Sequence, residues 1–228
     1  MPTERYTAKV AIVGTGAGGA TAAAVLARAG VDTILIEQGR YYKPEDHGDI
    51  LTSMRRMYVN GGMTLALGNP PVPIPLGCAV GGTTIINSST CFRPPRAKVD
   101  HWEGPSWEAL EPCLREVETR LHVGPAEESL LGNNYQVLKR GCDKLGIAIR
   151  PLAHNLYGCK SSGRCAFGCP TGAKQSTDRT FVPDAIEAGT RLYTEHTVTD
   201  VIRKGGRLVG LKGETPSGAF EVYADVII

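Results

Sequence analysis

The apolar residues near the start of this chain occur in two short blocks. Residues 8–13 (AKVAIV) and residues 33–37 (TILIE) are apolar runs of strand length, and each predicts a buried strand. Between them, a glycine-rich turn leads into an alanine-rich stretch that ends at Gly30, as a helix would. The connection is short, so the two strands are expected to be parallel, and the segment reads as a strand–helix–strand unit.

The middle of the chain changes pattern twice. Residues 39–76 are rich in Gly, Pro and Tyr and show no period, which predicts a long irregular excursion. Two amphipathic helices are expected after it, near Ser106–Leu121 and near Asn134–Leu145. Their apolar faces consist of Leu110, Leu114, Val117 and Leu121 in the first helix, and of Tyr135, Leu138, Cys142 and Leu145 in the second.

Residues 192–228 show the pattern of short apolar strands and turns that is typical of a β-meander. The expected strands are Leu192–Thr194, Thr197–Arg203, Leu208–Lys212 and Phe220–Ile228. Gly205 and Gly206 mark the turn between the second and the third. No internal repeat or low-complexity tract interrupts this order.

Charge and apolar composition limit the partners and the location that we expect for this protein. The 228 residues carry a formal net charge of +2 and no Lys/Arg run, which argues against nucleic acid and acidic membrane surfaces as partners. Residues 1–9 lack the apolar core of a signal peptide, and four prolines interrupt the apolar run from 61 to 86. We therefore expect a cytoplasmic protein, or one that reaches a membrane only through a partner.

The first glycine loop has the spacing of a dinucleotide site. Gly14, Gly16 and Gly19 form G-x-G-x-x-G between a predicted strand and a predicted helix. The first glycine allows a tight turn, the second lets the backbone approach a pyrophosphate, and the third lets helix and strand pack closely. The helix N-terminus then offers free N–H groups and a positive dipole to the phosphates.

The acid at the end of the second strand limits the choice of nucleotide. Glu37 can accept hydrogen bonds from a ribose hydroxyl, and its charge opposes a 2′-phosphate. NADP is therefore disfavoured, whereas FAD and NAD both remain.

A second glycine loop, at residues 77–95 (GCAVGGTTIINSSTCFRPP), favours FAD. It resembles the signature of the glucose–methanol–choline (GMC) oxidoreductases, in which a Gly-Gly pair is followed by hydroxyl residues, an Asn, a Thr and Arg-Pro. The matching residues here are Gly81, Gly82, Thr83, Thr84, Asn87, Thr90, Arg93 and Pro94. The family's loop wraps the FAD pyrophosphate and reaches the flavin ring.

By this resemblance, Thr83 is expected near the phosphates, Asn87 and Thr90 near the flavin ring, and the backbone of Val198 against the adenine. Cys78 stands where many members have a basic residue, and Phe92 falls one place late. These departures indicate a subgroup similar to long-chain alcohol oxidases and bacterial FAD sugar dehydrogenases.

The resemblance also implies the fold, an α/β Rossmann-like FAD-binding domain with a helical and loop insertion and a C-terminal β-meander. The expected parts of this one domain, residues 1–228, are a core over 7–40, 77–95 and 190–228, an irregular excursion over 41–76, and an insertion over 96–189.

A cysteine loop at residues 158–174 (GCKSSGRCAFGCPTGAK) carries a further hypothesis. Cys159, Cys165 and Cys169 have the spacing C-x5-C-x3-C with a trailing proline, which is common around iron–sulfur clusters. The loop resembles one that holds a 3Fe–4S cluster in the flavin subunits of some bacterial glucose dehydrogenases. A zinc site that includes His154, and a loop of free thiols without metal, are the alternatives. Ser162 stands where many relatives have another cysteine.

The expected function is the FAD-binding part of an enzyme that oxidises an alcohol or sugar CH–OH group by hydride transfer to flavin. In the family, a histidine far toward the C-terminus takes the hydroxyl proton. We therefore expect a substrate domain or partner subunit beyond these residues and assign no catalytic residue. A cluster would add a haem or quinone electron acceptor. The rival functions are an NAD-dependent dehydrogenase and a non-catalytic FAD-binding or electron-transfer module that needs a partner chain.

Overall fold

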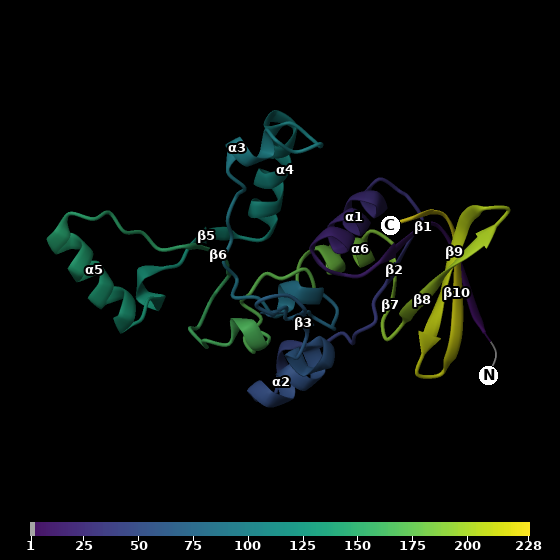
Figure 1. The fold of residues 1–228 in the computed structure, drawn as a ribbon, viewed down its shortest axis with the longest axis horizontal. Coiled ribbons are helices and arrows are strands. Elements are labelled where there is room, and N and C mark those ends of the chain that lie inside the picture. The colour runs from purple at the N-terminus through teal and green to yellow at the C-terminus, as the bar shows by residue number, and fades with distance from the viewer. Residues whose placement is uncertain (1–2) are drawn as a thin grey trace.

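A mixed sheet of six strands forms the centre of the computed structural model, which describes residues 3–228 (Figure 1). The strands are β1 (Glu4–Val13), β2 (Thr33–Ile36), β7 (Arg191–Tyr193), β8 (Thr197–Lys204), β9 (Arg207–Thr215) and β10 (Gly218–Ile227). Their order is β7-β2-β1-β10-β9-β8. β1 pairs in parallel with both β2 and β10, and β8, β9 and β10 form an antiparallel meander. The Rossmann-like α/β class expected from the sequence is confirmed.

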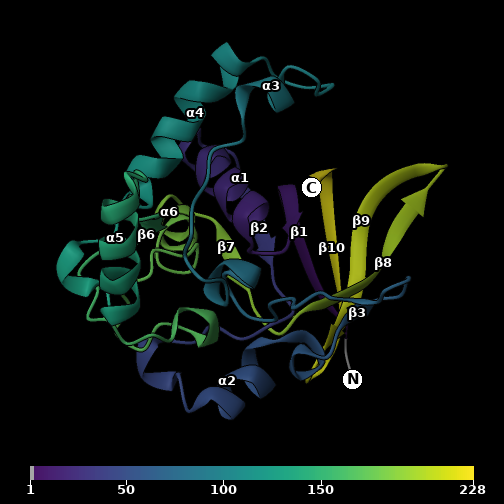
Figure 2. The ribbon, with the colours of Figure 1, turned by 60° about the vertical axis from the view of Figure 1, so that its left-hand side comes forward.

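Two helices, α1 (Ala17–Arg28) and α6 (Phe181–Glu187), cover one face of the sheet (Figures 1 and 2). Alternate strand residues point to each face, so Ile12 and Leu35 pack against the helices while Ala11 and Ile34 belong to the opposite core. The buried surface of α1 is made of alanines, at positions 20, 23, 24 and 27. These small side chains allow the helix to lie close to the sheet.

The strand over Leu192–Thr194 does not begin the meander, as the sequence analysis expected. It is β7, which pairs in parallel with β2 at the opposite edge of the sheet from β8. The reason is α6, which the sequence analysis missed. This helix packs on α1 and returns the chain on that side of the sheet, beyond β2.

The excursion over residues 41–76 is more ordered than its lack of a period suggested. It contains the one-turn helices η1 (Pro44–Asp46) and η2 (Val59–Gly62), helix α2 (Ile50–Met57), and the hairpin strands β3 (Leu65–Ala66) and β4 (Val72–Pro73). Asp49 caps α2 by accepting hydrogen bonds from the backbone N–H and the hydroxyl of Thr52, at 3.0 and 2.8 Å. Met57 anchors the helix because its side chain is fully buried.

The insertion lies outside the sheet, and its two longer helices match the sequence expectation. The short helix η3 (Gly82–Ile85) belongs to the second glycine loop and precedes the insertion. The insertion then contains α3 (Arg96–Val99), α4 (Trp107–Arg120), β5 (Val123–Pro125), η4 (Glu128–Leu130), α5 (Asn133–Leu145), β6 (Ala153–Asn155) and η5 (Cys165–Phe167), and ends with α6, which packs on the sheet. Val117 and Leu121 pack against the main core, whereas α5 projects away from it and buries none of its residues (Figure 1). Among residues 3–228, no helix is both long enough and apolar enough to cross a membrane.

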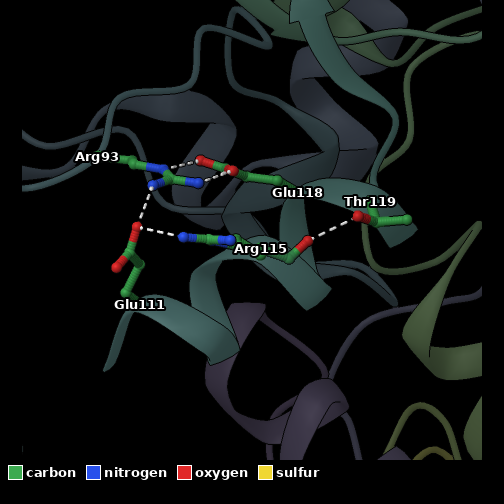
Figure 3. Close-up of polar contacts among 5 residues, drawn as sticks. All are labelled: Arg93, Glu111, Arg115, Glu118 and Thr119. Atoms are coloured by element: carbon green, nitrogen blue, oxygen red, sulfur yellow. Dashed lines mark hydrogen bonds and ion pairs between the residues drawn. The ribbon is translucent and has the colours of Figure 1, made fainter. Parts of the chain in front are cut away.

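Ion pairs hold α4 in place at two points. Arg93, which follows the second glycine loop, donates two hydrogen bonds to Glu118, at 2.6 and 2.5 Å, and lies 3.8 Å from Glu111 (Figure 3). In the same last turn of α4, Arg120 forms a bidentate pair with Asp184 of α6, which also accepts from Arg28 of α1 at 2.6 Å. One carboxylate thus joins three helices.

We predict that Asp184→Asn lowers the free energy of unfolding by about 1–2 kcal/mol, because it removes the charge-assisted bonds of a carboxylate that is 14% exposed. Hydrogen bonds from Arg120 lower the pKa of Asp184 in the folded protein. A lowered folded-state pKa stabilises the fold above the ordinary Asp pKa of about 3.9 and loses that contribution as pH falls below it. Urea unfolding at neutral and acid pH measures both effects. Asp143→Asn removes an exposed pair on α5 and should change little.

Candidate functional site

The first glycine loop has the geometry that its spacing predicted. Gly14 has a φ of 95°, in the region that favours glycine. A Cβ on Gly19 would lie 2.0 Å from the carbonyl oxygen of Gly14, so α1 could not approach β1 with any side chain there. A Cβ on Gly16 would meet no protein atom within 4 Å. Gly14 and Gly19 therefore shape the turn, whereas Gly16 leaves open space outside it.

The N-terminus of α1 is open to a ligand. Its N-cap residue, Gly16, provides no side-chain hydrogen bond, and no acidic residue lies in the first turn. The first N–H groups of a helix need partners, and the helix dipole favours an anion at this end. A pyrophosphate would supply both the acceptors and the charge.

Glu37 lies beneath this loop. One of its carboxylate oxygens accepts from the backbone N–H and the hydroxyl of Thr15, at 3.0 and 2.6 Å, and the other accepts from the N–H of Gly39 at 2.9 Å. The residue is 5% exposed. The carboxylate therefore already binds the protein, in addition to the ribose contact expected of it.

The second glycine loop lies directly against the first. The N–H of Gly81 donates to the hydroxyl of Thr15 at 2.8 Å, and a Cβ on Gly82 would lie 3.1 Å from the Cα of Gly16. Thr177 donates to the Thr15 carbonyl at 2.9 Å and contacts the Thr84 hydroxyl at 3.0 Å. The two loops form one rigid unit.

The polar residues Thr83, Asn87 and Thr90 of the second loop each contact a different part of the chain. Thr83 accepts from the N–H of Gly77 at 3.1 Å. Asn87 accepts through Oδ1 from the N–H of Ser89, at 3.0 Å. The backbone of Thr90 forms an isolated antiparallel β-bridge with that of His154.

Two cavities flank the paired loops. The smaller, about 420 Å³, lies beyond the end of β2, and its lining includes Gly39, Cys78 and Thr197. The larger, about 850 Å³, begins at the first turn of α1, and its lining includes Thr84 and Asn87. A two-ended dinucleotide with its pyrophosphate against the outside of the paired loops fits this arrangement, because each end would have a cavity. Val198, the expected adenine contact, is the neighbour of Thr197 on β8.

The three cysteines of the cysteine loop are not gathered around one point in this structure. Within residues 3–228, no group of three or more His, Cys, Asp or Glu side chains is placed to hold a metal ion. Cys159 accepts from the N–H of Ser161 at 3.4 Å, and Cys169 contacts the Thr171 hydroxyl at 3.3 Å. The 3Fe–4S cluster at Cys159, Cys165 and Cys169 stays a prediction without support from this geometry.

His154 Nδ1 lies 3.0 Å from the Ser89 hydroxyl. Among residues 3–228 it is not grouped with the cysteines as a metal site, so the zinc alternative also stays a prediction. Burial opposes ionisation of Cys169, but hydrogen bonds from the Thr171 hydroxyl and from nearby backbone N–H groups outweigh it and lower the pKa of this thiol.

Three residues that hold the site together were not found from the sequence. They are Thr15, Lys174 and Thr177, which are 0%, 1% and 4% exposed. Thr15 occupies a variable position of the glycine motif. Lys174 is the last residue of the cysteine loop and Thr177 lies just beyond it, in the sequence Gly-Ala-Lys-Gln-Ser-Thr, where polar residues without a period were the only signal.

In comparison with known proteins, a family model described as GMC oxidoreductase matches residues 54–228. The chain is 35% identical, over 97% of its length, to an uncharacterised GMC-type oxidoreductase of Mycobacterium tuberculosis, and covers 37% of that protein. It is 32% identical, over 80% of its length, to the long-chain-alcohol oxidase FAO4B of Arabidopsis thaliana, and covers 25% of it.

The fold is similar to two solved structures. They are a formate oxidase (TM-score 0.71, 19% identity, 99% of this chain and 46% of that one) and pyridoxine 4-oxidase from Mesorbium loti (TM-score 0.71, 14% identity, 96% and 48%). The chain thus spans less than half the length of each of these relatives and structures.

We predict that Glu37→Gln weakens the fold before any nucleotide binds. An amide cannot accept from three donors as a carboxylate does, so the free energy of unfolding without ligand should fall by about 2–3 kcal/mol. Denaturant unfolding of the ligand-free protein measures this. An unchanged midpoint would show that Glu37 acts only on a bound ribose. Glu195→Gln, on the rim of the smaller cavity, is the control.

Proposed function

The chain belongs to the GMC oxidoreductase family, of which it forms an FAD-binding part, and we propose that the enzyme oxidises an alcohol CH–OH group by hydride transfer to the flavin. The observation that carries this proposal is the pair of interlocked glycine loops at an uncapped helix N-terminus, with a cavity on each side. The similarity to long-chain-alcohol oxidases favours an alcohol over a sugar as the substrate class.

Each residue of the site has a proposed role toward FAD. Gly16 and Thr83 would offer backbone N–H groups to the pyrophosphate, whereas the N–H groups of Gly14, Gly81 and Gly82 are bound within the protein and shape the two turns. Gly19 lets α1 lie close enough to reach the ligand. Glu37 would share its remaining lone pairs with the ribose while it holds the loop. The Val198 backbone would contact the adenine.

On the other side of the loops, Asn87 and Thr90 would lie near the flavin ring, at the larger cavity. Bound FAD supplies the hydride acceptor, and the protein supplies position and electrostatics. We assign no base for the hydroxyl proton to residues of this chain.

The NAD-dependent alternative is disfavoured because a simple NAD site does not need a second glycine loop, and here that loop is hydrogen-bonded to the first. A non-catalytic FAD-binding module is the other candidate, and it would also bind flavin. Turnover of an alcohol with an artificial electron acceptor by the whole protein separates the two.

We predict that Gly16→Ala abolishes FAD binding without harming the fold. The new methyl group would meet no protein atom within 4 Å, and the backbone there has an ordinary φ of −65°. It would occupy the space that a pyrophosphate needs, so FAD affinity should fall by about a hundredfold or more. Flavin absorbance after equilibration with FAD, together with the thermal midpoint of the ligand-free protein, gives both readouts.

The matched control is Gly19→Ala, whose methyl group collides with the Gly14 carbonyl. This variant should lose stability as well as FAD. If Gly16→Ala binds FAD as the parent does, the pyrophosphate site is wrongly placed.

An iron–sulfur relay is a separate hypothesis, which rests on cysteine spacing and resemblance alone. It predicts iron and acid-labile sulfide in protein purified without oxygen, both lost in Cys169→Ser because thiolates fix the irons. FAD-loaded protein without iron contradicts it, and zinc in place of iron favours the site with His154.

A further inference from the structure

A buried lysine, Lys174, lies under the second glycine loop. It is 1% exposed, although lysine is almost never fully buried without partners. Its Nζ donates to the carbonyl oxygens of Ile85, Asn87 and Cys165, at 2.7, 3.0 and 2.6 Å. The three N–H donors of one ammonium therefore have three backbone acceptors.

These acceptors come from two segments that are far apart in the sequence. Ile85 and Asn87 belong to the second glycine loop, and Cys165 belongs to the cysteine loop. Burying an ammonium costs several kcal/mol, so the fold retains it only because its contacts offset that cost. Burial lowers the pKa of Lys174 to about 8, whereas the nearby Cys165, Asp178 and Cys169 favour its charged form.

The same ammonium also acts on the Asn87 side chain. Two donor groups face Asn87 Oδ1. The N–H of Ser89 donates to it at 3.0 Å, and Lys174 Nζ lies 3.5 Å away and acts there by its positive charge, because its three N–H groups already have backbone acceptors. An amide NH2 group in that place would oppose both donors, so the carbonyl end of the amide must point there. No residue of the described chain, 3–228, accepts a hydrogen bond from the NH2 end, and Asn87 lines the larger cavity.

We propose that Lys174 is a positioning residue that holds Asn87 with its amide NH2 group toward the larger cavity, as a hydrogen-bond donor to an acceptor atom of the bound flavin. The proposal rests on the proposed function, because the flavin is the ligand it assumes. Through Cys165, the same ammonium makes the orientation of Asn87 depend on the cysteine loop.

The first test is Asn87→Asp. The carboxylate keeps an acceptor for Lys174 and for the N–H of Ser89, but it has no NH2 group to donate. FAD should therefore bind about tenfold more weakly, while the thermal midpoint of the ligand-free protein stays the same or rises. Parent-like FAD affinity in this variant would overturn the proposal.

The second test is a double-mutant cycle with Lys174→Met and Asn87→Ala. Lys174→Met should weaken FAD binding about tenfold in the parent and less than about twofold in Asn87→Ala, because Lys174 acts through the Asn87 amide. A purely structural role would give the same factor in both backgrounds and would overturn the proposal. Lys139→Met, on the exposed α5, should leave FAD affinity unchanged.

If Lys174→Met does not fold, Lys174→Gln takes its place in the cycle. The first test does not depend on either variant, because Asn87→Asp leaves Lys174 in place. The FAD affinity of the parent protein distinguishes failure of the proposed function from failure of the role proposed for Lys174. A parent that binds no FAD refutes the proposed function itself. A parent that binds FAD, with additive effects in the cycle, refutes only the role of Lys174.

Discussion

The site depends on one hydroxyl group, that of Thr15. It donates to Glu37 at 2.6 Å and accepts from the N–H of Gly81 at 2.8 Å, and the residue is fully buried. These bonds join the first glycine loop, the end of β2 and the second glycine loop, which are separated by up to 66 residues. A buried hydroxyl with both of its hydrogen-bonding roles satisfied fixes its neighbours in one arrangement, because any shift leaves a polar group unpaired.

The glycines and alanines around Thr15 follow from this contact. The two loops can meet only if their backbones approach closely, and a side chain on Gly82 would crowd the Cα of Gly16 at 3.1 Å. Gly19 allows the equally close approach of α1 to the Gly14 turn. The alanine face of α1 serves the same purpose between helix and sheet. The first N–H groups of α1 have no partner within the helix, as in any α-helix, and Gly16 provides no side-chain cap. These N–H groups therefore offer the position for an anionic ligand.

A second set of contacts connects this core to the insertion. Asp184 joins α1, α4 and α6, Arg93 attaches α4 to the end of the second glycine loop, and Lys174 attaches the cysteine loop to Asn87. The insertion is therefore bonded to the loop that the proposed flavin would contact. By contrast, α5 buries no residue, and both Leu138 and Leu145 of its apolar face are more than half exposed.

The sequence by itself determined the strand–helix–strand unit, the two glycine loops, the larger insertion helices and the family, because these depend on local spacing and on residues such as glycine that have few substitutes. The tertiary structure alone decided the place of β7, the orientation of the Glu37 carboxylate, and the roles of Thr15, Lys174 and Thr177. Among residues 3–228 the three spaced cysteines are not gathered as a metal-binding group, so the cluster stays a prediction from spacing and resemblance. The physical reason is the same in each case. Spacing along a chain limits what neighbouring residues can do, whereas the partner of a buried polar group is set by segments that come together only when the chain folds.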